Sequence, residues 1–366
     1  MLYLTFKKKK ARKKMPSTGI DSLKEWFLLE KRSFPWREEY STPYAVWVSE
    51  VMLQQTRASV VIAYFKRWMQ RFPTLESLAV APLEEVLKMW EGLGYYSRAR
   101  NLRQGAIQIL EEGGSFPNSL EKLLKIKGIG PYTAGAILSF AFHQKSPAID
   151  GNVARVVSRY KGVFGDLTTS KAKKRLEEET LSLLPEIEPW IIMEALIELG
   201  ATFCLPNPNC SKCPLQSNCY SFAYEVTDQI PLKKKRQETL FLQNQVAVIF
   251  FGSDVLVEIK EEGKVLGGLA EFPSFPYLAD QNIEEEVLKR LGLEVDWQED
   301  LSSQKQSFTR YQVDLYPSIL RAKEKKNVLG CLWVCLDCLV EEFTFSSGHK
   351  KVLSQLAEFS FENSRT

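Results

Sequence analysis

The hydrophobic pattern of the chain changes near residue 238, and this change constrains the fold more than any other feature. From about residue 20 to 200, apolar residues recur at intervals of three and four, as in Leu83, Val86, Leu87 and Trp90, which is typical of amphipathic helices. Prolines and glycines break this pattern into helix-sized segments. Beyond residue 238, runs such as VAVIFF and YQVDLYPSIL are rich in strand-forming residues. The sequence therefore predicts a helical domain followed by a smaller α+β domain.

The chain length limits the number of domains, and the charge distribution marks a basic tail at the N-terminus. With 366 residues, the chain can form two or three domains, and it has no apolar run of about 20 residues, so we expect no membrane span. Seven of the first fourteen residues are Lys or Arg, and we expect this segment to be a disordered tail rather than a nucleic-acid contact. The expected regions are a basic tail (1–19), the helical domain (20–203), a cysteine loop (204–229), a basic linker (230–238) and the second domain (239–366).

The stretch KIKGIGPYTAGAI, residues 125–137, combines two glycines with the start of a helix. Gly128 and Gly130 allow the backbone to approach an anion closely, and the helix that opens at Pro131 offers free N–H groups. A corner between two helices also uses glycine, so the pattern alone leaves both interpretations open. The functional interpretation is a hairpin that binds phosphate.

Two carboxylates are candidates for acid–base chemistry. Glu50 is a lone acid in the apolar segment VWVSEVML; it lies either on a solvated stripe with Gln54 or in a desolvated site that raises its pKa and lets it donate a proton. Asp150 precedes a helix, where it serves as an N-cap, and we expect the helix N-terminus to depress its pKa. One protonated and one ionised carboxyl group are the pair that cleaves a glycosidic bond.

Four cysteines form a candidate metal site. Cys204, Cys210, Cys213 and Cys219 follow the spacing C-x5-C-x2-C-x5-C, and four thiolates in one loop suit either zinc or a [4Fe–4S] cluster. Seven cysteines in a chain of this size favour a reducing compartment over a disulfide scaffold.

Four collinear motifs resemble one family. SEVMLQQT (49–56), GLGYYSRARN (92–101), GPYTAGAI (130–137) and DGNVARV (150–156) are similar to motifs of the MutY-type adenine glycosylases, which belong to the helix-hairpin-helix DNA glycosylases. The resemblance runs from about Arg32 to Cys219 and weakly beyond. It implies a mainly helical glycosylase domain with a four-cysteine metal-cluster loop, followed by a C-terminal α+β Nudix-like domain. It also favours a [4Fe–4S] cluster over zinc, although the family usually has six residues in the first cysteine gap.

The resemblance implies a catalytic role for four residues. Glu50 corresponds to the general acid that protonates N7 of a flipped-out adenine. Asp150 corresponds to the aspartate that stabilises an oxocarbenium-like deoxyribose, and Asn152 would support it. Tyr132 takes the position of a lysine that forms a Schiff base in related bifunctional enzymes. Because a phenol cannot form that adduct, the expected activity is base removal without efficient strand cleavage.

The same resemblance implies a set of DNA-binding residues. Arg32, Trp36 and Glu194 correspond to adenine-pocket positions, and Leu53 is assigned to the substrate-binding set with them. Gln55 and Tyr95 correspond to side chains that wedge into the base stack, whereas Leu93 and Thr56 would approach the opposite base. In the second domain, Phe308 and Thr309 would read an oxidised guanine, although Arg310 stands where the family has histidine.

The expected partner is double-stranded DNA that carries an 8-oxoguanine·adenine or guanine·adenine mispair, bound by a monomer. Such a protein would act in the cytoplasm of a bacterium, on the nucleoid, or in the nucleus or mitochondrion of a eukaryote. Two alternatives remain open: an endonuclease-III-like glycosylase/lyase for oxidised pyrimidines, and a DNA-damage-binding protein without catalysis.

Overall fold

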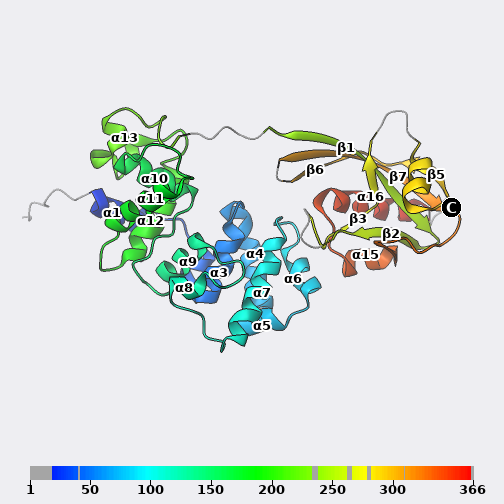
Figure 1. Ribbon diagram of the computed structural model, residues 1–366, viewed down its shortest axis with the longest axis horizontal. Helices are drawn as coiled ribbons and strands as arrows, with labels where there is room; N and C mark the ends of the chain where they lie inside the picture. The colour runs from blue at the N-terminus through cyan, green and yellow to red at the C-terminus, as the bar shows by residue number, and fades with distance from the viewer. Residues whose placement is uncertain are drawn as a thin grey trace, which may run out of the picture. The chain divides into compact units, whose positions relative to one another are not determined.

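The computed structural model describes residues 19–39, 42–232, 238–261, 266–277, 282–308 and 310–363. The described chain falls into two compact units, one containing residues up to 76 and 104–234 and the other containing 77–103 and the residues from 235 onward. The first unit is helical, and the second contains helices and a mixed β-sheet (Figure 1). The predicted change from helical to α+β structure is confirmed. Most of the expected tail (1–18) and residues 233–237 of the expected linker lie outside the described residues.

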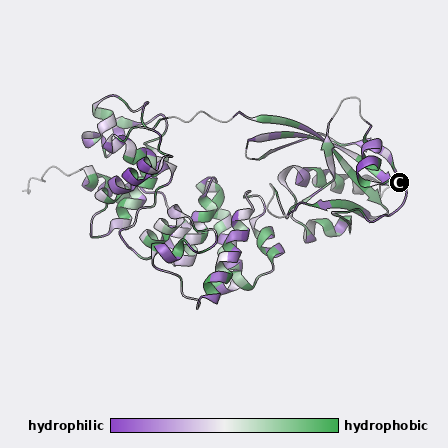
Figure 2. Ribbon diagram, viewed as in Figure 1, coloured by the Kyte–Doolittle hydropathy of each residue, from purple (hydrophilic) through white to green (hydrophobic). Residues whose placement is uncertain are grey.

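The helices before the sheet are α1 (Gly19–Glu30), α2 (Pro35–Glu38), α3 (Pro43–Leu53), α4 (Ala58–Arg71), α5 (Leu75–Val80), α6 (Leu83–Trp90), α7 (Ser97–Glu111), α8 (Leu120–Leu123), α9 (Pro131–Ala136), α10 (Gly151–Lys161), α11 (Ser170–Leu183), α12 (Pro189–Thr202) and α13 (Tyr220–Ala223). Their ends follow local signals. The Thr42 hydroxyl accepts a hydrogen bond from the backbone N–H of Ala45 (3.2 Å) at the start of α3. Gly162 ends α10 with φ of 68°. Most of these helices carry both green and purple residues in Figure 2, as amphipathic helices do.

Close helix contacts in the first unit depend on two glycines. A Cβ atom at Gly200 would lie 2.6 Å from Cβ of Asn152, and one at Gly135 would lie 2.0 Å from the carbonyl oxygen of Pro147. Real Cβ atoms do not come this close to other atoms. Glycine at these positions therefore lets α12 pack on the start of α10, and lets α9 pack on the segment that leads to Asp150.

The predicted hairpin joins α8 to α9. Gly128 adopts a φ of 83°, a left-handed conformation that favours glycine, while Ile126 and Ile129 are buried beneath the turn. Gln108 of α7 holds the turn from one side, because its amide donates to the carbonyl of Lys125 (3.1 Å) and its oxygen accepts from the N–H of Lys127 (3.1 Å). Beyond α9 the helix continues as a π-helical turn over Ile137–Ala141.

The sheet of the second unit contains, among the described residues, β1 (Leu240–Phe251), β2 (Asp254–Ile259), β3 (Ala270–Glu271), β4 (Ser274–Pro276), β5 (Val295–Asp300), β6 (Gln304–Phe308), β7 (Tyr311–Ala322) and β8 (Cys331–Cys335). The strand order is β3-β2-β1-β7-β5, with β4 beside β1, β6 beside β7 and β8 beside β2. β1 and β7 are parallel, and the other pairs are antiparallel.

Both faces of this sheet are covered. Val246 and Val248 of β1 point into a core that includes α15 (Leu336–Glu342) and α16 (Ser347–Asn363), whereas Ala247 and Ile249 point into a core that includes α14 (Ile283–Leu291). Successive strand residues face opposite sides, which explains why VAVIFF is apolar without a break. Across the described residues, no helix is long and apolar enough to cross a membrane.

Candidate active site

A cleft of about 910 Å³ in the first unit brings ten of the predicted site residues together. It is lined by residues of α3, α9, α10 and α12 and by the segment around α2. The predicted residues on its wall are Arg32, Trp36, Glu50, Leu53, Gln55, Thr56, Tyr132, Asp150, Asn152 and Glu194. Residues predicted from separate motifs therefore share one site.

Glu50 lies on α3 and is buried, with an exposed fraction of 6%. The solvated-stripe interpretation of this residue is therefore wrong. Burial raises the pKa of Glu50 from 4.5 to about 7, although a hydrogen bond from Tyr132 partly opposes the rise and the nearby charge of Asp150 adds to it. A carboxyl group with this pKa holds a proton for a substantial fraction of the time near neutral pH, as a general acid must.

Tyr132 is the second residue of α9 and donates a hydrogen bond from its phenol to Oε2 of Glu50 (2.5 Å). Burial, together with the negative charge of Glu50, raises the pKa of Tyr132 well above its ordinary value. The phenol therefore stays protonated and remains a donor. This contact fixes the orientation of the Glu50 carboxyl group, and no residue spacing in the sequence pointed to it.

Asp150 caps α10, as its position before the helix suggested. Its carboxylate accepts hydrogen bonds from the N–H of Val153 (2.7 Å) and from the side-chain amide of Asn152 (2.8 Å). The predicted depression of its pKa is wrong in direction. Burial raises the pKa of Asp150, and the hydrogen bonds from Val153 and Asn152 only partly oppose this rise. The prediction considered the helix N-terminus and missed the desolvation that the cleft imposes.

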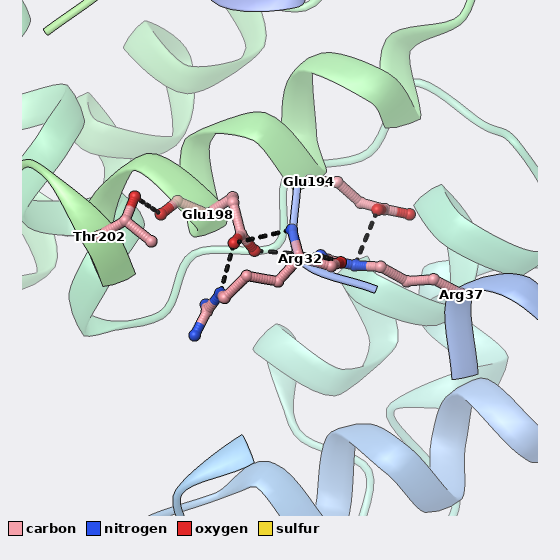
Figure 3. Close-up of polar contacts among 5 residues, drawn as sticks. All are labelled: Arg32, Arg37, Glu194, Glu198 and Thr202. Atoms are coloured by element: carbon pink, nitrogen blue, oxygen red, sulfur yellow. Dashed lines mark hydrogen bonds and ion pairs between the residues drawn. The ribbon is translucent and has the colours of Figure 1, made fainter. Parts of the chain in front are cut away.

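Sequence reasoning missed two further residues of the cleft, Arg37 and Glu198. Figure 3 shows Arg37 with ion pairs to two glutamates of α12: its Nε lies 3.1 Å from Oε2 of Glu194, and its Nη1 lies 3.0 Å from Oε2 of Glu198. Arg32 donates to Oε1 of Glu198 from Nε (2.5 Å) and from its backbone N–H (3.4 Å). Glu198 lies four residues after Glu194 in the otherwise apolar helix α12, and a second acid on the same helix face is a signal that could have identified it.

Several predicted residues do not line this cleft. Gly128 and Gly130 lie on the hairpin, where a Cβ atom added to Gly130 would meet no atom within 4 Å. Leu93 and Tyr95 belong to the second unit, and Leu93 is buried whereas Tyr95 is 47% exposed. Phe308, at the end of β6, lies opposite Tyr311 of β7, with 5.6 Å between the ring centroids. Thr309 lies outside the described residues.

The four predicted cysteine ligands line one small cavity after α12, together with Arg159 of α10. Arg159 Nη1 lies 3.5 Å from Sγ of Cys204 and also donates to the carbonyl of Leu205 (2.6 Å). Arg155 links the cysteine loop to the start of α10, because it donates to the carbonyl of Cys204 (2.6 Å) and to Oδ1 of Asn152 (2.8 Å). In the described part of the chain, no three His, Cys, Asp or Glu side chains meet at the spacing of ligands to a single metal ion.

Two family models match the chain. Residues 48–182 match the HhH-GPD superfamily base excision DNA repair protein, and residues 245–355 match the NUDIX domain. The first match covers the segment from α3 to α11 and includes Glu50, the hairpin and Asp150. The second covers most of the mixed sheet and its helices. The Nudix-like expectation for the C-terminal fold is thus confirmed.

The chain is also similar to named proteins. It is 47% identical to the adenine DNA glycosylase of Rattus norvegicus over 208 residues, which are 54% of this chain and 40% of that protein. It is 33% identical to the adenine DNA glycosylase of Buchnera aphidicola subsp. Schizaphis graminum over 307 residues, which are 82% of this chain and 87% of that protein. It spans about two-fifths of the length of its mammalian relatives. Among solved structures, a thermostable thymine-DNA glycosylase matches with a TM-score of 0.52 and 26% identity, over 56% of this chain and 95% of that one.

Proposed function

The chain belongs to the adenine DNA glycosylase family, and we propose that it removes adenine from duplex DNA by hydrolysing the N-glycosidic bond, as a step of base excision repair. The observation that carries this proposal is the buried Glu50, whose pKa is about 7, in a cleft that also contains Asp150. The mammalian relatives are longer than this chain, so the activity is assigned on the described site rather than on their names alone.

Glu50 would donate a proton to the departing base. Adenine leaves the sugar poorly as an anion, and a proton on its ring nitrogen makes it a neutral leaving group. Because Oε2 of Glu50 accepts the hydrogen bond from Tyr132, Oε1 is the oxygen left to hold the proton. Tyr132 thus selects the oxygen that faces the base.

Asp150 would stabilise the positive charge that develops on the sugar as the bond breaks. Hydrogen bonds from Val153 and Asn152 favour its ionised form and fix its direction. An oxocarbenium-like state flanked by a carboxylate is the usual arrangement for glycosidic cleavage. Water then completes the hydrolysis, and the DNA strand stays intact because position 132 holds a phenol rather than an amine.

Recognition of the DNA would be shared between the two units. The hairpin around Gly128 and Gly130 would bind backbone phosphates, which position a protein without reading sequence. Adenine is a normal base, so the choice of a wrong adenine requires the opposite strand to be read. We assign the reading of 8-oxoguanine to the Nudix-like domain, around Phe308 and Thr309, and the preferred substrates to the 8-oxoguanine·adenine and guanine·adenine pairs.

The four cysteines would hold a [4Fe–4S] cluster, with zinc as the alternative. Four thiols line one cavity, and Arg159 brings a positive charge to within 3.5 Å of Cys204 Sγ, which suits a group that carries several thiolates. Such a cluster would supply a rigid cross-link for the loop. Iron and sulfide analysis of protein purified without oxygen tests the assignment, and stoichiometric zinc without iron would contradict it.

We also propose that the protein is a monomer. It would act in the compartment that contains DNA, which is the cytoplasm of a bacterium or the nucleus or mitochondrion of a eukaryote.

The activity is tested on an end-labelled duplex with one adenine opposite 8-oxoguanine. We expect strand scission only after alkali, because hydrolysis leaves an abasic site in an intact strand. Glu50→Gln should bind the duplex and release no base, since its amide keeps the shape of the carboxyl group but cannot donate the proton. Scission without alkali would favour the glycosylase/lyase alternative. Binding without any scission, in the unchanged protein, would favour a DNA-damage-binding protein.

A further inference from the structure

Glu198 is an ionised side chain with no part in the chemistry described above, yet it lies at the wall of the cleft. The exposed fraction of its side chain is 1%. Burying a carboxylate is costly unless charged donors compensate for the lost water, and here both oxygens are paired, Oε1 with Arg32 and Oε2 with Arg37. Burial works to raise the pKa of Glu198, but the two arginines outweigh it and lower the pKa. Glu198 is thus a fixed negative charge.

Arg37 connects Glu198 to Glu194. Its side chain is 12% exposed, its Nη1 also donates to the carbonyl of Arg32 (3.2 Å), and its guanidinium lies over the ring of Phe34 at 5.2 Å. The donors of a guanidinium share one rigid plane. The bond from Nη1 to Glu198 therefore also sets the direction in which Nε points toward Glu194.

Of the three linked side chains, Glu198, Arg37 and Glu194, it is Glu194 that faces the cleft. Arg37 engages its Oε2 (Figure 3), so Oε1 is the oxygen left to contact a bound base in the cleft that Glu194 lines. Burial raises the pKa of Glu194, and the positive charge of Arg37 opposes this rise and favours the carboxylate form. A carboxylate oxygen held in a desolvated pocket accepts an N–H and repels another acceptor. At the corresponding ring carbon, adenine carries an amino group, whereas guanine and hypoxanthine carry a carbonyl group.

We propose that Glu198 is a positioning residue for base selection: through Arg37 it holds the Glu194 carboxylate so that Oε1 accepts a hydrogen bond from the exocyclic amino group of the base. This inference rests on the proposed function and deepens it. Glu198 acts on which purine is released, while Glu50 and Asp150 act on the bond that breaks. A purely structural tie between α12 and the segment around α2 would instead affect every base equally.

The test is Glu198→Gln, which keeps the side-chain volume and removes the charge that orients Arg37. Single-turnover release is measured at saturating protein from duplexes with adenine or unsubstituted purine opposite 8-oxoguanine. Purine lacks the amino group, so it cannot report on the hydrogen bond to Glu194. We expect the adenine-to-purine rate ratio to fall by about tenfold, as for the loss of one charge-assisted hydrogen bond, while the rate on purine stays nearly unchanged.

Two further variants make the result decisive. Arg37→Lys keeps the charge but cannot bridge two carboxylates in one plane, so it should lower the ratio similarly, and it serves in place of Glu198→Gln should that variant not fold. Glu186→Gln breaks an exposed ion pair with Lys145 in the same unit and should leave the ratio unchanged. If Glu198→Gln leaves the adenine-to-purine rate ratio unchanged, or lowers the release rates of both bases equally, this inference is overturned and the proposed function is not. Failure of the unchanged protein to release adenine overturns the proposed function and this inference with it.

Discussion

The phenol of Tyr132 donates a hydrogen bond to Oε2 of Glu50 at 2.5 Å, and both side chains lie in the interior of the cleft. The contact has two opposing effects on the proposed role of Glu50 as a proton donor. It orients the carboxyl group, which assists proton transfer, and it favours the ionised form, which cannot donate a proton. Burial is the larger influence on the pKa of Glu50, which is therefore raised to about 7 in spite of the contact.

Tyr132→Phe separates these effects. Glu50 is an acid only while protonated, so the rate of adenine release should fall as the pH rises through about 7. Removing the phenol hydroxyl removes a hydrogen bond that lowers the pKa of Glu50, so the decline should move to higher pH. We expect the maximum rate to fall by about tenfold, because the carboxyl group loses its orientation. Single-turnover rates measured across the pH range report both changes.

Tyr224→Phe is the matched control, because it removes the hydroxyl of an exposed tyrosine in the same unit. It should leave the pH profile in place. A decline that stays at the same pH in Tyr132→Phe, or moves to lower pH, would show that the phenol does not act on the proton equilibrium of Glu50.

Glu50 should also reduce the stability of the folded protein at neutral and alkaline pH. Its pKa rises from 4.5 to about 7 on folding, so the folded state binds more protons than the unfolded state between these values. The free energy of unfolding therefore falls as the pH rises through this window, by about 3 kcal/mol in total for this group. Glu50→Gln should remove this loss, and its melting temperature should exceed that of the unchanged protein at pH 8 but not at pH 4. Equal melting temperatures at pH 8 would contradict a desolvated carboxylate at this position.

How far the site could be predicted from sequence depends on what each residue contacts. Glu50 and Asp150 were found because a lone acid among apolar residues and an acid before a helix are local patterns. The Tyr132–Glu50 bond was not found because it joins residues 82 apart along the chain. The upward shift of the Asp150 pKa was not found because it depends on burial in the assembled cleft. The ion pairs of Arg37 with Glu194 and Glu198 are equally non-local, because the arginine precedes its partners by 157 and 161 residues. Hydrophobic periodicity does not predict contacts between residues so far apart in the sequence.

The fold was easier to predict than the site because periodicity is a local property. The runs VAVIFF, DVLVEIK and YQVDLYPSIL became β1, β2 and β7. The order of these strands in the sheet could not be predicted from the sequence, because β1 pairs in parallel with β7, which lies about 70 residues later. The two buried faces of β1 explain the continuous apolar run after the fact.

The hairpin can be tested without disturbing the fold. Gly130 has an extended backbone, with φ of −97°, and a Cβ atom there would meet nothing within 4 Å. Gly130→Val should therefore fold normally, and its side chain should occupy the space in which a phosphate would lie. We expect about tenfold weaker binding to damaged and undamaged duplex alike, because phosphate contacts do not read sequence. Release of adenine at saturating protein should change little. Weaker binding to the damaged duplex alone would show that the hairpin reads the lesion.

The turn Gly92–Tyr96 offers the last prediction. Tyr95 is exposed, although its backbone is left-handed, with φ of 50°, a conformation that costs a non-glycine residue about 1–2 kcal/mol. Arg98 of α7 stabilises it: Nη2 donates to the carbonyls of Leu93 (3.1 Å) and Gly94 (2.9 Å), and the guanidinium lies 5.5 Å from the Tyr95 ring. Burial lowers the pKa of Arg98 to about 10, so it remains charged near neutral pH.

Arg98→Met keeps an unbranched side chain about as long as the aliphatic part of arginine and removes the donors that shape this turn. If Tyr95 enters the base stack, as the family resemblance implies, a loosened turn should weaken binding to a duplex with adenine opposite 8-oxoguanine by about tenfold, because the protein must then order the turn on binding. Tyr95→Ala should weaken binding similarly, and the double variant should be no weaker than Tyr95→Ala alone, since both changes act through one side chain. The dissociation constants of the unchanged protein, the two single variants and the double variant, all measured at one salt concentration, form a double-mutant cycle. Additive losses would mean that Arg98 supports binding by a route that does not pass through Tyr95.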